Sequence, residues 1–262
     1  MKAHLRQIIC LLVVGTIACS GASVEGDWNY NFESPLPASF VFNQIGPPSG
    51  TFSGGIDSGA LRLSDPQILT GGPNFGGIGR ETSQIFSDAR MSGTLNAAGN
   101  SNDLLGLSIR NQALGNNTYG ARIDFNTGRL GVFKIVNFVG VFDIASDSPE
   151  QGSQPLLADL ARGYFVQFDV IGNALDARVF DGPGGSQLLH VHYLDDQGIG
   201  GPPLGPGFAG VSALRNVGSL DGAFDNLSVT AIPEPGTCVL AVVGLAVLVL
   251  FRRSNLLNRT SL

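Results

Sequence analysis

The chain has 262 residues and a formal net charge of −6, a length that allows one large all-β domain or two small domains. Lys134 is the only lysine between the two chain ends, and five of the 15 basic residues lie at those ends, so the middle of the chain is more acidic than the whole. Such a chain lacks the basic stripe that neutralises phosphates, which excludes nucleic acid as a partner.

The N-terminal segment has the order of a secretory signal peptide. Lys2 and Arg6 precede the run "IICLLVVGTIACSGAS", whose apolar core of about a dozen residues ends in small residues near 18–23. We expect residues 1–23 to be removed on export. Two alternatives stay open: a buried N-terminal helix, and a lipoprotein signal that ends at Cys19. Against the second stands Thr16, which occupies the place of a bulky aliphatic residue.

The cysteines also point to export, without disulfide bonds. All three of them, Cys10, Cys19 and Cys238, fall in the two apolar end segments. The predicted mature body, residues 24–231, therefore has no thiol. This excludes a disulfide framework, a cysteine nucleophile and a metal held by cysteine. A domain of about 200 residues buries enough surface to fold without such cross-links.

The body consists of short alternating apolar and polar stretches divided by Gly, Asn, Asp and Pro. Strands with one apolar face are predicted at 103–110, 118–125, 163–173, 174–181 and 188–195. Tight turns are expected at "NTG" and "GN", where glycine can adopt positive φ. We count about twelve to fourteen strands and no amphipathic helix of three turns. The pattern predicts one domain of two antiparallel sheets packed over a shared core.

The stretches "YGARIDFNTGRLGVF", "GYFVQFDVIGNALDARVFD" and "GVSALRNVGSLDGAFDNLSV" occur in the order found in a known fold. Over residues 103–229 this order resembles the concanavalin-like, laminin-G-like jelly-roll sandwich. The resemblance implies the fold more than the function, because that fold carries lectins, adhesion modules and glycosidases alike.

The C-terminal segment begins with a stiff stretch and continues as an apolar run. Pro233 and Pro235 force an extended backbone. Thr237 to Phe251 is then fifteen residues without a charge, about 22 Å as a helix. This is short of the ~30 Å of hydrocarbon in a bilayer, although flanking residues and bilayer thinning make up part of the difference. Arg252 and Arg253 hold that end in the cytoplasm, so we expect the body to lie outside.

The order Pro-Glu-Pro, transmembrane helix and arginine pair resembles the PEP-CTERM sorting signal of bacterial exported proteins. In that family a membrane-embedded protease, the exosortase, recognises the signal and cleaves there. The resemblance implies that, within residues 232–253, the recognised triplet and the stop signal are Pro233, Glu234, Pro235, Arg252 and Arg253. Nine residues follow, 254–262, where the family tail is usually shorter; we expect them in the cytoplasm. The alternative is a plain single-pass anchor in which Pro-Glu-Pro is only a hinge.

Catalytic carboxylates for glycoside hydrolysis are not evident in the body. Glycosidases need two carboxylates that face one bond, and concanavalin-like glycosidases carry them as Glu-x-Asp-x-x-Glu on one strand. The four glutamates before the tail, at 25, 33, 81 and 150, do not form this pattern. We therefore expect no enzyme but a binding or structural module, associated with extracellular polysaccharide. The alternative is a secreted polysaccharide-acting hydrolase with another arrangement of carboxylates.

One polar strand face carries the candidate ligand-binding residues Arg178, His190 and His192. The two histidines are the only ones in the mature body, and Asp176 is expected on the same face. Two imidazoles and a carboxylate are suitable ligands for a divalent metal. We expect these residues to form a solvated strand face without a metal; a platform for a sugar and a divalent metal site are the alternatives.

Scattered aspartates in predicted turns raise the question of calcium, namely Asp143, Asp147, Asp181 and Asp221. Their spacing matches no calcium-binding loop, and turn chemistry alone explains aspartate at such positions. We expect no cofactor, with Ca²⁺ as the alternative.

Overall fold

The computed structural model describes residues 27–45, 51–69, 75–97, 103–112, 117–137, 140–146, 157, 159–196, 200–215 and 218–232. Within these ranges the chain forms fifteen β-strands and no helix. The strands build two sheets in which all paired neighbours are antiparallel. The prediction of an all-β sandwich of two antiparallel sheets is confirmed, and Gly26–Ile232 forms one compact unit.

The larger sheet has eight strands. In spatial order these are β13 (Gln187–Leu194), β12 (Ala174–Phe180), β11 (Tyr164–Ile171), β6 (Ala89–Asn96), β15 (Gly218–Ala231), β4 (Ala60–Leu69) and β3 (Ser53–Asp57), with the short β1 (Trp28–Tyr30) paired to β15.

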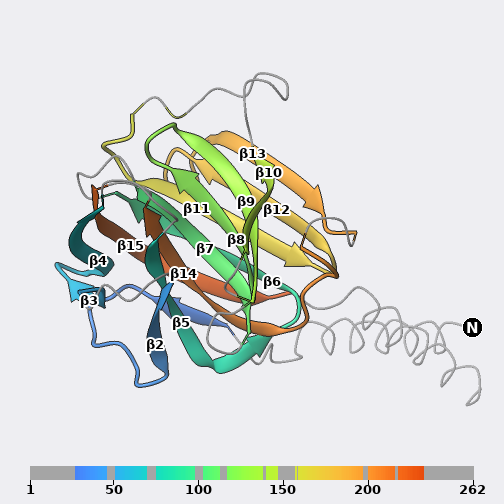
Figure 1. Cartoon of the computed structure of the whole chain (residues 1–262), viewed down its shortest axis with the longest axis horizontal. Helices are drawn as coiled ribbons and strands as arrows, with labels where there is room; N and C mark the ends of the chain where they lie inside the picture. Colours follow the sequence, from blue (N-terminus) through green and yellow to red (C-terminus); the bar gives the residue numbers. More distant parts are fainter. Residues whose placement is uncertain are drawn as a thin grey trace, which may run out of the picture. The chain divides into compact units, whose positions relative to one another are not determined.

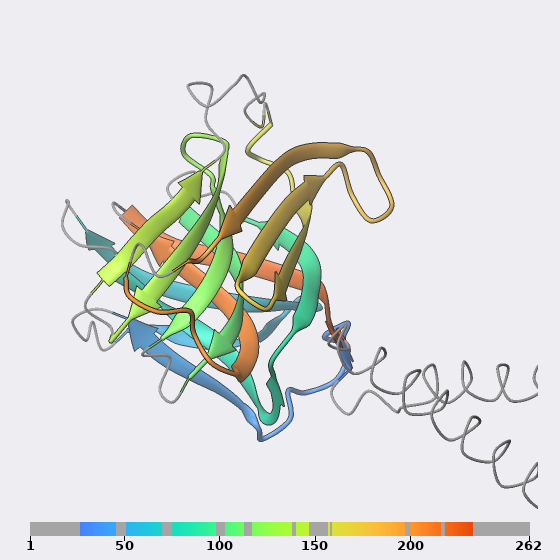
Figure 2. The same ribbon diagram turned by 90° about the vertical axis from the view of Figure 1, so that its right-hand side faces the viewer.

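The smaller sheet has seven strands. Their spatial order is β10 (Gly140–Ser146), β9 (Arg129–Val136), β8 (Thr118–Asp124), β7 (Asp103–Asn111), β14 (Gly207–Arg215), β5 (Phe75–Phe86) and β2 (Phe40–Ile45). Figures 1 and 2 show the two sheets as layers, with the green strands β7 to β9 in one and the yellow to gold strands β11 to β13 in the other.

The core lies between the layers and is built by alternation along each strand. From the seven-stranded sheet it takes Leu105, Leu107, Ile109, Tyr119, Ala121 and Ile123, and from the eight-stranded sheet Val166, Phe168, Val170, Leu175, Ala177 and Val179, all of them fully buried. Each large apolar side chain buried in this way contributes roughly 1.5–3 kcal/mol. Because successive side chains of a strand point to opposite faces, the same alternation turns the polar residues outward.

The two hairpins expected from the turn sequences are present. β8 pairs with β9 across a turn that ends at Gly128, whose φ is 74°. β11 pairs with β12 across Gly172 and Asn173, and Gly172 has a φ of 59°. Both glycines occupy the left-handed region, which L-residues with a Cβ adopt only at a cost.

A buried polar network closes one side of the core. The Lys134 side chain is completely buried, and its Nζ donates to Asp195 Oδ2 at 2.8 Å and to the carbonyl oxygens of Gly201 and Pro202 at 2.9 and 2.8 Å. Tyr119 donates its hydroxyl to the same Asp195 carboxylate. Burial, together with this hydrogen bond, raises the pKa of Tyr119 above its usual value. The network holds the segment between β13 and β14 against the seven-stranded sheet.

The first and last described residues of the body are neighbours. β1 pairs with the C-terminal part of β15, where Trp28 lies opposite Val229. Asp27 accepts a hydrogen bond from the Ala231 backbone N–H, and the Ile232 N–H donates to the Asp88 carbonyl at 2.9 Å. The backbone hydrogen bonding of the described residues therefore extends as far as Ile232, which immediately precedes Pro233.

Candidate functional site

The outer face of the eight-stranded sheet is polar over most of its width. Here β6 presents Arg90, Ser92 and Thr94. The next strands of the sheet, β11, β12 and β13, continue this polar face with Gln167, Asp169, Asp176, Arg178, His190 and His192. The side chains between them are buried in the core. A binding site on this face is supported by a rigid sheet rather than by loops.

The predicted cluster of Arg178, His190 and His192 is brought together around Asp176. Arg178 Nη2 lies 2.6 Å from Asp176 Oδ1, His190 Nε2 lies 2.8 Å from Oδ2, and His192 Nδ1 lies 3.5 Å from the same oxygen. The register of β12 and β13 explains the geometry, because Arg178 pairs with His190 and Asp176 with His192. The expectation that the two histidines share the polar face is confirmed.

Neighbouring charges tie this cluster to the centre of the sheet. Arg90 binds Asp169 with two hydrogen bonds, from Nε at 2.9 Å and from Nη2 at 2.7 Å. Arg178 Nη1 lies 4.0 Å from the Asp169 carboxylate. Each basic group of the cluster thus has a carboxylate partner within the sheet, an arrangement that a solvated, self-paired strand face also produces. Its role in ligand binding stays a prediction.

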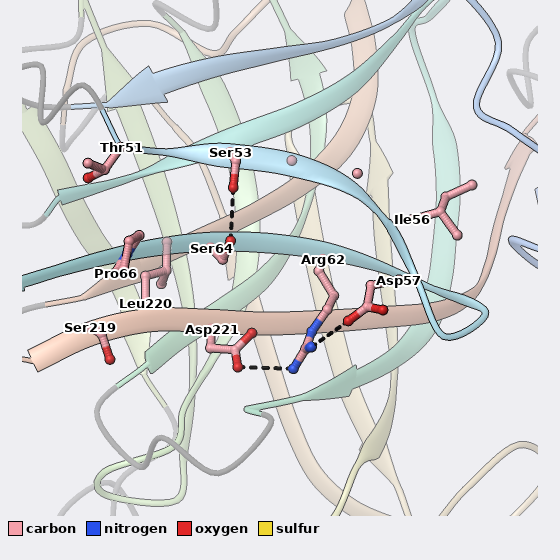
Figure 3. A pocket seen from close by; sticks show the side chains of 12 residues that line it. Thr51, Ser53, Ile56, Asp57, Arg62, Ser64, Pro66, Ser219, Leu220 and Asp221 are labelled. Carbon is pink, nitrogen blue, oxygen red and sulfur yellow. Dashed lines mark hydrogen bonds and ion pairs between the residues drawn. The ribbon is translucent and has the colours of Figure 1, made fainter.

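A groove opens on the outer face at the opposite edge of the same sheet (Figure 3), with a volume of about 630 Å³. Its lining comes from β3, β4, β15 and the residues next to them: Thr51, Ser53, Gly54, Gly55, Ile56, Asp57, Arg62, Ser64, Pro66, Ser219, Leu220 and Asp221. This volume lies within the range of about 300–1,000 Å³ found for small-molecule sites.

Arg62 is the centre of the groove's polar lining. Its Nη1 donates to Asp57 Oδ2 at 2.7 Å and its Nη2 to Asp221 Oδ2 at 3.0 Å (Figure 3). The hydroxyls of Ser53 and Ser64 are hydrogen-bonded to each other at 3.0 Å across the β3–β4 pair. All five side chains lie on the outer face, and their polar atoms are half-exposed or exposed.

Local sequence explains why the groove forms at this place. β3 and β4 are joined by a tight turn in which Ser58 and Gly59 both have positive φ, 54° and 78°, as the two-residue hairpin turn requires. Gly55 leaves room in the groove, since a Cβ added there would have no atom within 4 Å. Asp221 joins from β15, far away in sequence, because it pairs with Ser64 of β4.

Buried polar groups support the groove from below. Thr51 donates its hydroxyl to Asp65 Oδ1 at 2.5 Å, and the carboxylate of Asp65 lies 3.2 Å from Arg215 Nη2. Asp103 is fully buried and accepts the backbone N–H of Asp221 at 2.9 Å. Burial raises the pKa of Asp103 to about 7. These contacts fix the chain at both sides of the groove.

No sequence pattern pointed to this groove. The sequence predicts Asp221 in a turn, with calcium as the alternative, whereas the structure places it in β15, bound to Arg62. The short alternation from Ser53 to Ser64 carries a signal for an outward row of polar residues. The proximity of Asp221 follows only from the strand order, which the sequence does not show.

The carboxylates of the groove bear on the question of catalysis. Asp57 and Asp221 are both bound by Arg62, and hydrogen bonds from Arg62 and Ser58 lower the pKa of Asp57 below its usual value. A glycosidase acid needs the opposite, a carboxyl group whose pKa is raised so that it holds a proton near neutrality. The buried Asp103 has a raised pKa, but it does not line the groove.

Several predicted residues can be placed only in part. Asp181 forms an ion pair with Arg162, while Asp147 and the side chain of Asp143 lie outside the described residues. In the part of the chain that the structure describes, no group of three or more histidine, cysteine or acidic side chains is arranged so that it could hold a metal ion.

The sorting residues Pro233, Glu234, Pro235, Arg252 and Arg253 lie outside the described residues, as do the predicted signal peptide and transmembrane segment. Over the described ranges, no helix has the length and apolar character needed to span a bilayer.

No protein-family model and no curated protein matches the sequence. Solved structures do resemble it in fold. A structure described as a native glycosidic hydrolase has a TM-score of 0.52 at 11% identity, with 80% of this chain and 97% of the other covered. A β-1,3-1,4-glucanase (lichenase) derived from a mouse hindgut metagenome has a TM-score of 0.50 at 12% identity, with 79% and 99% covered.

A plant protein shows the same degree of likeness. Lectin I from Ulex europaeus, in complex with a methyl glycoside of α-L-fucose, has a TM-score of 0.50 at 13% identity, with 78% of this chain and 96% of the lectin covered. At such low identity these likenesses show the fold alone, a jelly-roll-like sandwich of two antiparallel sheets.

Proposed function

We propose that the sandwich is a non-catalytic glycan-binding module of an exported protein and that the groove of β3, β4 and β15 is its ligand site. The observation that carries this proposal is the groove itself. It is open, about 630 Å³ in volume, and lined by hydroxyls, two carboxylates and a guanidinium held in place by a rigid sheet. Sugar hydroxyls both donate and accept hydrogen bonds, so a lining of this kind suits them.

The fold supports the proposal without deciding it. Lectins and glucanases are among the structures that share the fold, and a shared fold does not carry function with it. The outer face of a sheet is also a surface on which an extended polysaccharide can lie without entering a deep cavity. We therefore assign the ligand class from the groove and use the fold as support.

A polysaccharide hydrolase is the second candidate, since Asp57 and Asp221 face the same groove. The electrostatics favour binding, because both carboxylates are bound to Arg62 and the pKa of Asp57 is lowered. A carboxyl group with a lowered pKa is protonated, and can act as a general acid, only at low pH. Incubation with β-glucans, xylan and other glycans that releases no reducing ends supports the binding module; sustained release that is lost in Asp57→Asn supports the hydrolase.

The chain ends complete the proposed function. We propose that residues 1–23 direct export, and that the segment from Pro233 to Arg253 holds the body outside the membrane until an exosortase-type protease cleaves at Pro-Glu-Pro. One observation supports this: the last described strand, β15, ends at Ala231, and Ile232 still donates to the Asp88 carbonyl, so cleavage after this point leaves the described pairing of the sandwich unchanged. Mass spectrometry of the protein from its native cell tests the step. A mature C-terminus that retained Arg252 and Arg253 would contradict it.

The binding proposal is tested with a glycan array and residues 26–232, which form a compact unit around their own core. In the variant Gly55→Trp the indole fills the groove, since a Cβ at Gly55 meets no atom within 4 Å. The matched control is Thr230→Trp, an exposed position on the outer face of the same sheet.

We expect at least one glycan class to be retained by the wild-type body and by Thr230→Trp but not by Gly55→Trp, with equal melting temperatures for all three proteins. Equal retention by Gly55→Trp would show that the glycan binds elsewhere. An array without any retained glycan would contradict the proposed function.

A further inference from the structure

The hydrogen-bonding capacity of the groove is unbalanced toward acceptors. Each carboxylate provides about four acceptor positions and no donor, and Asp57 and Asp221 both line the groove. Arg62 is the one cation among the described residues that line it, and its two Nη atoms already donate to these carboxylates. The serine and threonine hydroxyls of the lining both donate and accept, so the charged groups decide the balance, and they offer an entering ligand mainly acceptors.

A second hollow beside the groove has the same bias. It has a volume of about 450 Å³ and is lined by Phe32, Glu33, Ser34, Pro35, Leu36 and Ile56. Ile56 belongs to both linings, so the two hollows adjoin at β3. The second one adds a carboxylate, that of Glu33, and no cation. Its remaining walls are largely apolar, as is usual for ligand sites, and apolar walls can pack against the C–H faces of sugar rings.

The charges beneath the groove do not reverse this balance. Arg215 is buried against Asp65, so the two charges offset each other. Asp103 lies under the backbone N–H of Asp221 and adds negative charge whenever it is ionised. Over the groove, its neighbour and the layer beneath them, the described carboxylates therefore outnumber the guanidinium groups.

We propose that the ligand of this groove is a glycan that bears free amino groups, an oligomer of amino sugars in its ammonium form. The inference rests on the proposed function and adds the ligand's chemistry to it. An ammonium group supplies three donors and a positive charge to a carboxylate-rich surface. Uronates and sulfated sugars bring further anions, which the same carboxylates repel. The hydroxyl-bearing lining and the apolar walls favour a sugar over a simple polyamine or a cationic peptide.

The experiment is a calorimetric titration of the body, residues 26–232, at low ionic strength and about pH 6, below the ordinary pKa of an amino group. Four ligands of equal length are compared: a glucosamine oligomer, its fully N-acetylated form, a galacturonate oligomer and oligolysine. We expect the glucosamine oligomer to bind roughly tenfold more tightly than the acetylated form, the sum of two or three half-exposed charge contacts. The galacturonate oligomer is expected to give no heat.

Charge variants locate the effect. The double variant Asp57→Asn/Asp221→Asn is expected to lose the tenfold preference for the free amine. Asp196→Asn, which removes an exposed carboxylate outside the groove, is the matched control and is expected to keep it. Raising the salt concentration is expected to reduce the preference as well, because exposed charges are screened. Thermal melting of each variant confirms that it is folded.

The failures of the two proposals are distinguishable. Equal affinity for the acetylated and the free-amine oligomer, both lost in Gly55→Trp, would overturn the amino-sugar inference and leave the glycan-binding function standing. Absence of binding by any of the three sugars would overturn the amino-sugar inference. It would contradict the glycan-binding function as well only if the array also retained no glycan. Oligolysine binding as tight as that of the glucosamine oligomer, with the same loss in the double variant, would show a general cation site and overturn the inference.

Discussion

Replacing Lys134 by methionine is expected to destabilise the sandwich by about 3–5 kcal/mol. The ammonium group is completely buried and uses all three donors, on Asp195 Oδ2 and on the carbonyl oxygens of Gly201 and Pro202. Methionine fills nearly the same space but leaves the Asp195 carboxylate buried without a counter-charge. The free energy of unfolding of most domains is about 5–15 kcal/mol, so such a loss is a large part of the total.

Equilibrium denaturation of residues 26–232 in guanidinium chloride measures this loss. The double variant Lys134→Met/Asp195→Leu is expected to recover most of it, because a well-packed apolar pair replaces a buried ion pair at little net cost. Two results would refute the reasoning: a loss below about 1 kcal/mol in the single variant, or a double variant as unstable as the sum of both single variants.

Three further outcomes are expected. Burial raises the pKa of Asp103 to about 7. The folded state therefore binds more protons than the unfolded state between about pH 4 and 7, and the free energy of unfolding falls as the pH rises through this window. Asp103→Asn should remove up to about 4 kcal/mol of that fall, measured by denaturation at pH 4 and 8. Gly172→Ala should cost about 1–2 kcal/mol because φ is 59° there, whereas Gly55→Ala should stay within about 0.5 kcal/mol; equal costs would contradict the backbone argument. Residues 26–232 should melt within about 2 °C of the full-length chain, because the core cluster and the strand pairings of the described residues lie within this range. A much lower melting temperature would show that the end segments stabilise the fold.

The architecture was predictable because the strands of this protein alternate regularly. Period-two patterns in β7, β8, β11 and β12 predicted one apolar face on each strand, and the residues of these faces are buried in the core between the sheets. Glycines at 128 and 172 indicated the two hairpin turns in the sequence, and both have positive φ values in the structure. Local patterns of this kind survive in the fold because one face of each of these strands packs into the core between the sheets.

The site was less accessible to such reasoning. Arg178, His190 and His192 were found together because they belong to one hairpin with a fixed register. The groove depends on β15 lying between β4 and β6, a non-local pairing that no periodicity reveals. Lys134 is a further example: it occupies an inward position that the pattern reserves for apolar residues, and its partner Asp195 lies 61 residues away in the sequence.

Mapping the ligand contacts on the body by NMR tests most directly whether the groove of β3, β4 and β15 is the ligand site. Backbone amide shifts of ¹⁵N-labelled residues 26–232 are recorded during titration with the glycan that binds most tightly on the array. If the groove is the ligand site, the perturbed amides cluster at 51–57, 62–66 and 219–221. Perturbations confined to β12 and β13, or to the seven-stranded sheet, would place the ligand elsewhere and contradict the assignment of the groove as the ligand site.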